Sequence, residues 1–92
     1  MLPDRGTIVI SLKGRDSGRF LIVVEASDGK VLVVDGKERP VDRPKLKNIK
    51  HIQLTSTVVS EEQMLTNRSI RHALNDFKAA HVKERFECPK RI

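Results

Sequence analysis

The chain has 92 residues, enough for one domain with a small hydrophobic core. Its 18 lysines and arginines outnumber its 12 acidic residues, and the formal charge of +6 favours encounters with nucleic acid, anionic membranes or acidic proteins. The absence of Trp and Tyr argues against stacking platforms for single-stranded bases, and no apolar run is long enough to span a membrane.

The first predicted strand leads into a basic turn that contains two glycines. Ile8, Ile10 and Leu12 recur at every second position, which predicts a half-buried strand over residues 7–12. The turn that follows reads Gly14-Arg-Asp-Ser-Gly18-Arg. Its guanidinium groups match phosphate oxygens in geometry and charge, so we expect this loop to contact a polyanion.

Two continuous apolar runs come next, and turn residues separate them. Residues 20–24 and 31–34 are rich in β-branched side chains, which favours strands over helices. Asp28-Gly29 lies between the runs and predicts a two-residue hairpin, because a type I′ turn needs positive φ at both central positions. Asp35-Gly36 marks the end of the third strand in the same way.

The connection from Lys37 to Lys50 carries most of the excess positive charge. Six cations against two acids leave a local charge of +4, and Pro40 and Pro44 keep the segment out of regular helix. A stiffened basic connection is suited to contacting phosphates, because little chain entropy is lost on docking. A solvated surface loop is the alternative. The cations are Lys37, Arg39, Arg43, Lys45, Lys47 and Lys50.

A fourth strand is expected at residues 51–55, where Ile52 and Leu54 alternate with polar side chains. Ile49 breaks this parity and is assigned to a turn or bulge before the strand. Short strands separated by turn residues favour a small closed or nearly closed barrel. The continuous apolar runs fit such a barrel only if another element covers part of its outside.

The C-terminal third supplies a candidate for that element. An apolar stripe predicts an amphipathic helix, with Thr66 or Asn67 as its N-cap. Packing on the barrel is the expected role of the stripe, and binding in a partner's groove is the alternative. The stripe consists of Ile70, Ala73, Leu74 and Phe77, and the other faces of the helix carry Arg68, Arg71, Asn75 and Lys78.

A shorter turn is expected before this helix. Ser60 to Gln63 matches a capping box, and Val59 and Met64 occupy the two positions of a hydrophobic staple. We therefore divide the chain into a barrel at 1–56, a helical extension at 57–82 packed on the barrel, and a mobile tail at 83–92.

Cysteine usage and the N-terminal residues bear on location. Cys88 is the only cysteine, so no internal disulfide can form, and we expect a free thiol in the tail. The first residues lack the apolar core of a signal peptide. These features predict a cytoplasmic protein, which we expect to be a monomer.

The residue patterns indicate no catalytic, cofactor or metal site. His51, His72 and His81 have no spacing that would place two of them on one helical turn beside a carboxylate or thiolate. The segment from Gly14 to Gly18 lacks the Gly-Lys-Ser/Thr ending of a P-loop. We expect a protein that is not an enzyme and needs no cofactor.

The order of these blocks resembles the KOW-motif proteins, in particular the ribosomal large-subunit family that begins with a KOW-type SH3-like barrel. The resemblance covers residues 6–55. Phe20 stands where many KOW motifs carry a further glycine. The matching blocks are Gly14-Arg-Asp-Ser-Gly18-Arg followed by Leu21-Ile-Val-Val24, then Val31-Leu-Val-Val-Asp-Gly36, and the basic stretch that runs into Asn48-Ile-Lys-His-Ile-Gln-Leu54.

This resemblance implies a mainly β fold, an SH3-like barrel of about five strands, here followed by the C-terminal helix. It also implies binding to structured, usually ribosomal, RNA, with Lys13, Arg15 and Arg19 at the contact and the Lys37 to Lys50 connection as a second surface. RNA and ribosomal proteins are the expected partners. The alternative is a protein-interaction or transcription-elongation adaptor that uses the same barrel.

Overall fold

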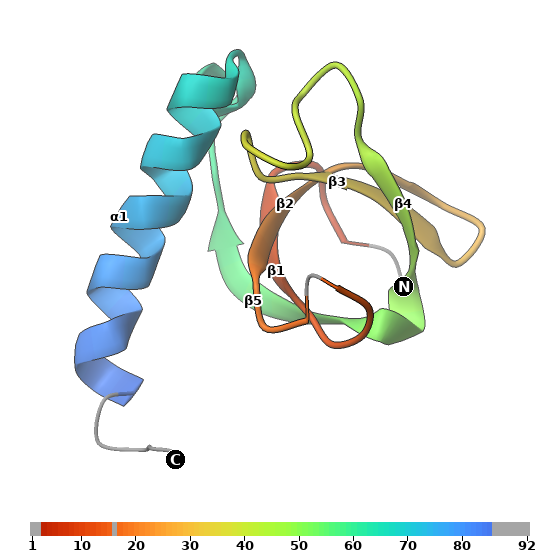
Figure 1. Cartoon of the computed structure of the whole chain (residues 1–92), viewed down its shortest axis with the longest axis horizontal. Helices are drawn as coiled ribbons and strands as arrows, with labels where there is room; N and C mark the ends of the chain where they lie inside the picture. The colour runs from red at the N-terminus through yellow and green to blue at the C-terminus, as the bar shows by residue number, and fades with distance from the viewer. Residues whose placement is uncertain (1–2, 16, 86–92) are drawn as a thin grey trace.

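The computed structural model describes residues 3–15 and 17–85 (Figure 1). In this part of the chain, five antiparallel strands form one curved sheet with the order β4-β3-β2-β1-β5, and a long helix packs on its outside. The strands are β1 (Thr7–Ser11), β2 (Phe20–Ser27), β3 (Lys30–Val34), β4 (Lys45–Asn48) and β5 (Ile52–Val58). The helical elements are the 3-10 turns η1 (Ile49–His51) and η2 (Glu62–Met64) and the helix α1 (Asn67–Arg85). The predicted mainly β class, a small barrel-like sheet with a C-terminal helix, is confirmed.

The sheet buries apolar side chains on both of its faces. Successive side chains of a strand point to opposite faces, so a continuous apolar run needs a core on each side. Leu21, Ile22 and Val23 of β2 are each 0% exposed. The cluster inside the curved sheet contains Val9, Leu21, Val23, Val31, Val33 and Ile52. The cluster outside it contains Ile8, Ile22, Val34, Val59 and Met64 together with the apolar stripe of α1.

The prediction of a half-buried first strand is wrong. β1 lies between β2 and β5, and Val9 and Ser11 are buried as fully as Ile8 on the opposite face. Leu12 follows the end of the strand and is 46% exposed. A central strand of a sheet with two cores does not follow the simple alternation that Ile8, Ile10 and Leu12 indicated.

The hairpin prediction is confirmed, and β2 before the turn extends to Ser27, beyond the predicted run at 20–24. Asp28 and Gly29 both have positive φ, at 51° and 74°, as a type I′ turn needs. The basic connection is not helical, as expected, but the sequence analysis assigned it no strand; its second half forms β4 and pairs with β3, with Lys47 opposite Val31. Ile49 lies in the turn η1 before the last strand, as predicted.

Thr66 caps helix α1. Its hydroxyl accepts a hydrogen bond from the Ser69 backbone N–H at 3.0 Å, and the Ser69 hydroxyl lies 3.1 Å from the Thr66 backbone nitrogen. Asn67, the alternative cap, accepts instead from the Val41 backbone N–H at 2.7 Å. The β3–β4 connection is therefore tied directly to the start of the helix.

The turn before the helix also has its predicted structure. The Ser60 backbone N–H donates to Gln63 Oε1 at 2.9 Å, and the Gln63 N–H donates back to the Ser60 hydroxyl at 3.3 Å. Val59 and Met64 are both buried in the outer core, as a hydrophobic staple requires. β5 ends at Val58, two residues beyond the expected barrel boundary at 56.

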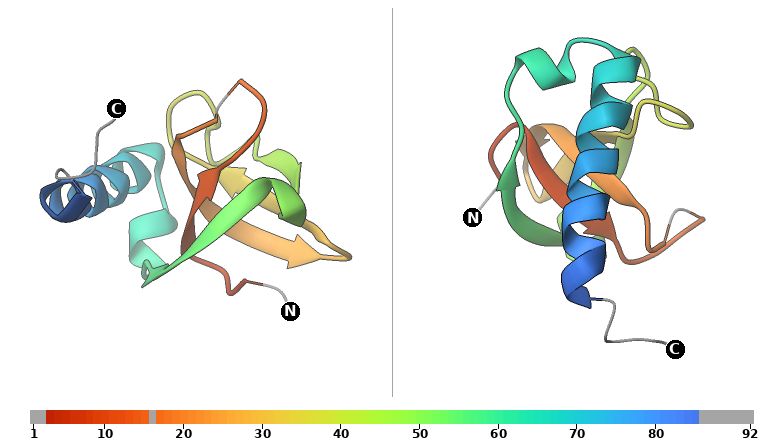
Figure 2. Two further views of the ribbon diagram at one scale, coloured as in Figure 1. Left: turned by 90° about the horizontal axis from the view of Figure 1, so that it is seen from below. Right: turned by 90° about the vertical axis from the view of Figure 1, so that its left-hand side faces the viewer.

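Helix α1 covers the outer face of the sheet (Figures 1 and 2). Its apolar stripe is buried, which confirms packing on the barrel, and the ring of Phe77 meets that of Phe20 edge-to-face with centroids 5.2 Å apart. α1 extends to Arg85, so residues 83–85 of the expected tail are helical. Residues 86–92, with Cys88, lie outside the described residues.

Candidate nucleic-acid interface

Two loops that the sequence predicted as contacts project from the same end of the barrel (Figure 2). They are the β1–β2 loop at residues 12–19 and the β3–β4 connection at residues 35–44. The connection includes the first part of the predicted Lys37 to Lys50 segment, and its three cations are balanced by three acids. The Arg19 guanidinium lies 2.9 Å from Glu38 Oε1 and joins one loop to the other. The Nζ of Lys47 on β4 donates a hydrogen bond to the Lys13 carbonyl at 3.1 Å. The expected contact and the expected second surface therefore adjoin as one surface, which we call the loop pair.

Hydrogen bonds at its base hold the β1–β2 loop in shape. The Ser11 N–H donates to the Arg19 carbonyl at 2.9 Å, and the Gly18 N–H donates to the Ser11 carbonyl at 2.7 Å. Gly14 and Gly18 have φ of 90° and 86°, a region that favours glycine. A Cβ on Gly18 would meet nothing within 4 Å, so the backbone conformation, and not a close approach, requires glycine there.

A carboxylate orders the first half of the β3–β4 connection. Asp35 Oδ1 accepts from the backbone N–H groups of Lys37 and Arg39, both at 2.8 Å. The Arg39 carbonyl accepts in return from the N–H groups of Asp35 and Gly36, at 2.9 and 3.1 Å. This turn is thus ordered without a partner by the Asp35 carboxylate, a residue before the two prolines that the sequence analysis expected to stiffen the segment.

Exposed cations without an ion-pair partner among the described residues occur in both loops. Lys13 and Arg15 belong to the first loop, and Lys37 and Arg43 belong to the second. Arg19 is exposed but paired with Glu38, and Arg39 is only half-exposed. The remaining predicted contact residues lie beyond the loops. They are Lys45 and Lys47 on β4 and Lys50 on η1.

Lys47 lies in the protein interior, in contrast to the other predicted contact residues. Its side chain is 9% exposed, and its Nζ hydrogen bond to the Lys13 carbonyl links β4 to the β1–β2 loop. Its neighbour Leu46 faces outward and is 55% exposed. The sequence of a basic stretch does not show which lysine side chain points inward. The pairing of β4 with β3 determines the direction of the Lys47 side chain. We therefore assign Lys47 a structural role.

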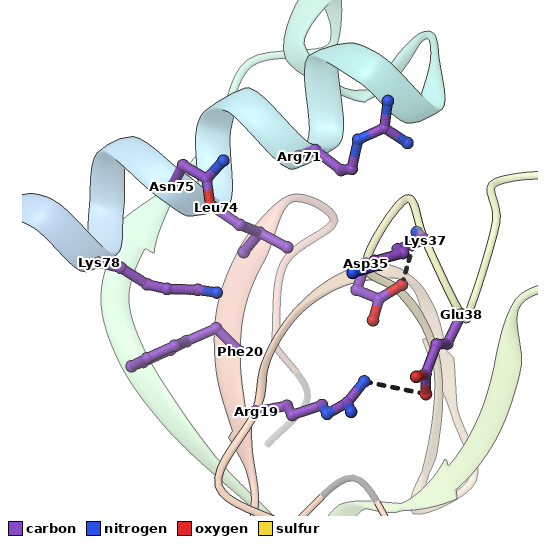
Figure 3. A pocket seen from close by; sticks show the side chains of 9 residues that line it. All are labelled: Arg19, Phe20, Asp35, Lys37, Glu38, Arg71, Leu74, Asn75 and Lys78. Atoms are coloured by element: carbon purple, nitrogen blue, oxygen red, sulfur yellow. Dashed lines mark hydrogen bonds and ion pairs between the residues drawn. The ribbon is translucent and has the colours of Figure 1, made fainter.

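Helix α1 adds cations beside the loop pair, and between them lies a groove of about 340 Å³ (Figure 3). Arg71 contributes one wall and donates to the Gly36 carbonyl at 2.8 Å. Asn75 and Lys78 follow along the same side of the helix. The sequence analysis placed Arg71 and Lys78 outside the apolar stripe. Their helical spacing puts them on one face beside that stripe, and this was the sequence signal that the face could line a site.

Comparison with known proteins assigns no family to the chain. Neither the protein-family models nor the curated proteins compared with it match. Among the described residues, no helix combines the length and the apolar character needed to cross a membrane. The site is therefore interpreted from the chemistry of its own residues.

Proposed function

We propose that the chain is a non-enzymatic RNA-binding protein that contacts structured RNA through the loop pair. The observation that carries the proposal is the junction of two loops, distant in sequence, at one end of the barrel through Arg19 and Glu38. Both loops carry exposed cations without an ion-pair partner among the described residues: Lys13, Arg15, Lys37 and Arg43. Such side chains suit the closely spaced phosphates of a nucleic acid.

The character of the loop pair favours structured RNA over single strands. Guanidinium and ammonium groups bind phosphates without reading a sequence, whereas sequence-independent binding of single strands relies on exposed aromatic rings. The chain has no Trp or Tyr, and its loops are held by internal hydrogen bonds. A rigid cationic surface of this kind recognises the shape and backbone of folded RNA.

The resemblance to KOW-motif ribosomal proteins supports a more specific form of the proposal. The residues that carry it include the β1–β2 loop with Arg15 and Arg19, one half of the loop pair. We accordingly take ribosomal RNA as the target, with ribosomal proteins as neighbours and the cytoplasm as the location. The protein would act there as a monomer, as a ribosomal component or an accessory factor.

The proposal is tested with Arg15→Ala and the charge-matched control Lys30→Ala. Arg15 is exposed in the loop pair, whereas Lys30 is exposed and pairs with Ser27 in the β2–β3 hairpin. That hairpin points away from the end of the barrel that carries the loop pair (Figure 2). Arg15→Ala should weaken binding to a labelled ribosomal RNA hairpin about three- to tenfold in fluorescence anisotropy, because one phosphate contact is lost. Lys30→Ala should change the affinity less than twofold.

Two outcomes would contradict the proposal. If the wild-type chain does not bind structured RNA at physiological salt, the function is wrong. If both substitutions weaken binding equally, the loop pair is not the interface. Circular dichroism of both variants establishes that each is folded.

A further inference from the structure

The groove beside α1 has the size of a small-ligand site. Its volume of about 340 Å³ lies at the lower end of the range for ligand pockets. It opens between the helix and the loop pair, so that RNA bound to the loops would pass its mouth (Figure 3). A groove of this size has room for one nucleotide and none for a duplex.

The rim of the groove is positive, although two acids line it. The Glu38 carboxylate is paired with Arg19, and Asp35 Oδ1 is occupied by two backbone N–H groups. Lys37 and Lys78 line the groove without an ion-pair partner among the described residues. These two ammonium groups are therefore available to an incoming phosphate.

The inner wall of the groove is apolar and ends in an amide. Phe20 and Leu74 supply the apolar surface, and the contact with Phe77 holds the ring of Phe20 in place. Asn75 lies on the helix beside Leu74 and carries both hydrogen-bond donors and an acceptor. Apolar surface next to a carboxamide is the combination that binds a nucleobase by its face and its edge.

We propose that this groove binds one unpaired nucleotide of the RNA, an inference that rests on the function proposed above. The phosphate lies against Lys37 and Lys78, and the base lies against Phe20 and Leu74 with its edge toward Asn75. A base within a duplex is paired and stacked and cannot enter, whereas a bulged base can. The loop pair then supplies general affinity, and the groove selects RNA that carries an unpaired nucleotide.

The test compares two RNA hairpins that differ by one bulged nucleotide. The wild-type chain should bind the bulged hairpin about tenfold more tightly, since a base against an aromatic ring contributes about 1–3 kcal/mol. Asn75→Ala, which changes no charge, should reduce this preference below threefold and leave the affinity for the continuous hairpin within twofold. Arg15→Ala should weaken binding to both hairpins by the same factor.

The outcomes separate the groove from the function as a whole. Equal affinity of the wild-type chain for both hairpins, with Arg15→Ala still weakening both, would contradict nucleotide binding in the groove and leave RNA binding by the loop pair intact. No binding to either hairpin would contradict the groove proposal and the proposed function together. Adenosine monophosphate at millimolar concentration should cancel the preference for the bulge without displacing the continuous hairpin. Micromolar binding of the free nucleotide with no bulge preference would make it the ligand and overturn the proposal.

Discussion

At Gly36 the backbone of the β3–β4 connection lies against the start of α1. Its φ is +78°, and a Cβ at this position would lie 2.5 Å from the Asn67 carbonyl oxygen. Gly29 has a similar φ of +74°, but a Cβ there would meet nothing within 4 Å. The two glycines share a backbone conformation and differ in crowding, so alanine at each separates the two effects.

Gly36→Ala should lower the free energy of unfolding by about 2–5 kcal/mol. About 1–2 kcal/mol comes from the left-handed backbone and about 1–3 kcal/mol from displacing the helix start. Gly29→Ala, as the control, should lose only the backbone part. Urea unfolding followed by far-ultraviolet circular dichroism measures both, because the chain has no Trp or Tyr to report by fluorescence. Equal losses in the two variants would mean that crowding at Gly36 has no energetic effect.

If RNA contacts Arg19 as proposed, Glu38 competes with it, because the carboxylate is paired with the guanidinium in the free chain. The side chains of the pair are 47% and 57% exposed, and an exposed pair contributes about 0.2–1 kcal/mol. Glu38→Gln should therefore tighten RNA binding about two- to fivefold in fluorescence anisotropy. Glu62→Gln removes the same charge from the exposed side chain of η2 and is the control. An equal gain in that variant would attribute the effect to net charge alone.

At the scale of elements, the apolar pattern predicted which segments form strands better than it predicted which faces they bury. The runs at 20–24 and 31–34 were assigned to strands and required a covering element, and α1 is that element. The first strand was assigned one buried face because Ile8, Ile10 and Leu12 recur at every second position. Position in the sheet decided burial there, and position depends on partners distant in sequence.

β4 shows why a basic strand escapes recognition. Its four residues alternate between lysine and other types, so the apolar period that marks a strand is absent. Lys47 nevertheless occupies the inward position at the edge of the sheet. An inward-pointing charge at an edge strand discourages pairing with another chain, a reason for lysine that the pattern cannot reveal.

At the scale of the whole molecule, the candidate site forms where segments distant in the sequence lie side by side. The sequence identified both loops from composition, and the residues Arg15, Lys37 and Arg43 are exposed as expected. It could not show that the loops adjoin, because the contact between Arg19 and Glu38 depends on the curvature of the sheet. The groove was beyond prediction for the same reason, since its walls come from β2, the connection and α1.

This juxtaposition predicts how RNA binding should depend on salt. The formal charge of +6 is spread over the chain, and the loop pair places Lys13, Arg15, Arg19, Lys37 and Arg43 at one end, beside the acids Asp35, Glu38 and Asp42. If those side chains contact phosphates, the logarithm of the affinity should fall against the logarithm of the salt concentration with a slope of about −4. Arg15→Ala should make the slope shallower by about 1, and Lys30→Ala should leave it unchanged.

Anisotropy titrations of one RNA hairpin between low and physiological ionic strength measure these slopes. Counterions are released only where a cation meets a phosphate, so the change in slope on substitution identifies the residues at the interface. A nearly flat dependence in the wild-type chain would contradict phosphate binding at the loop pair. An equal change of slope in Arg15→Ala and Lys30→Ala would mean that RNA responds to the charge of the whole chain. It would contradict the loop pair as the interface.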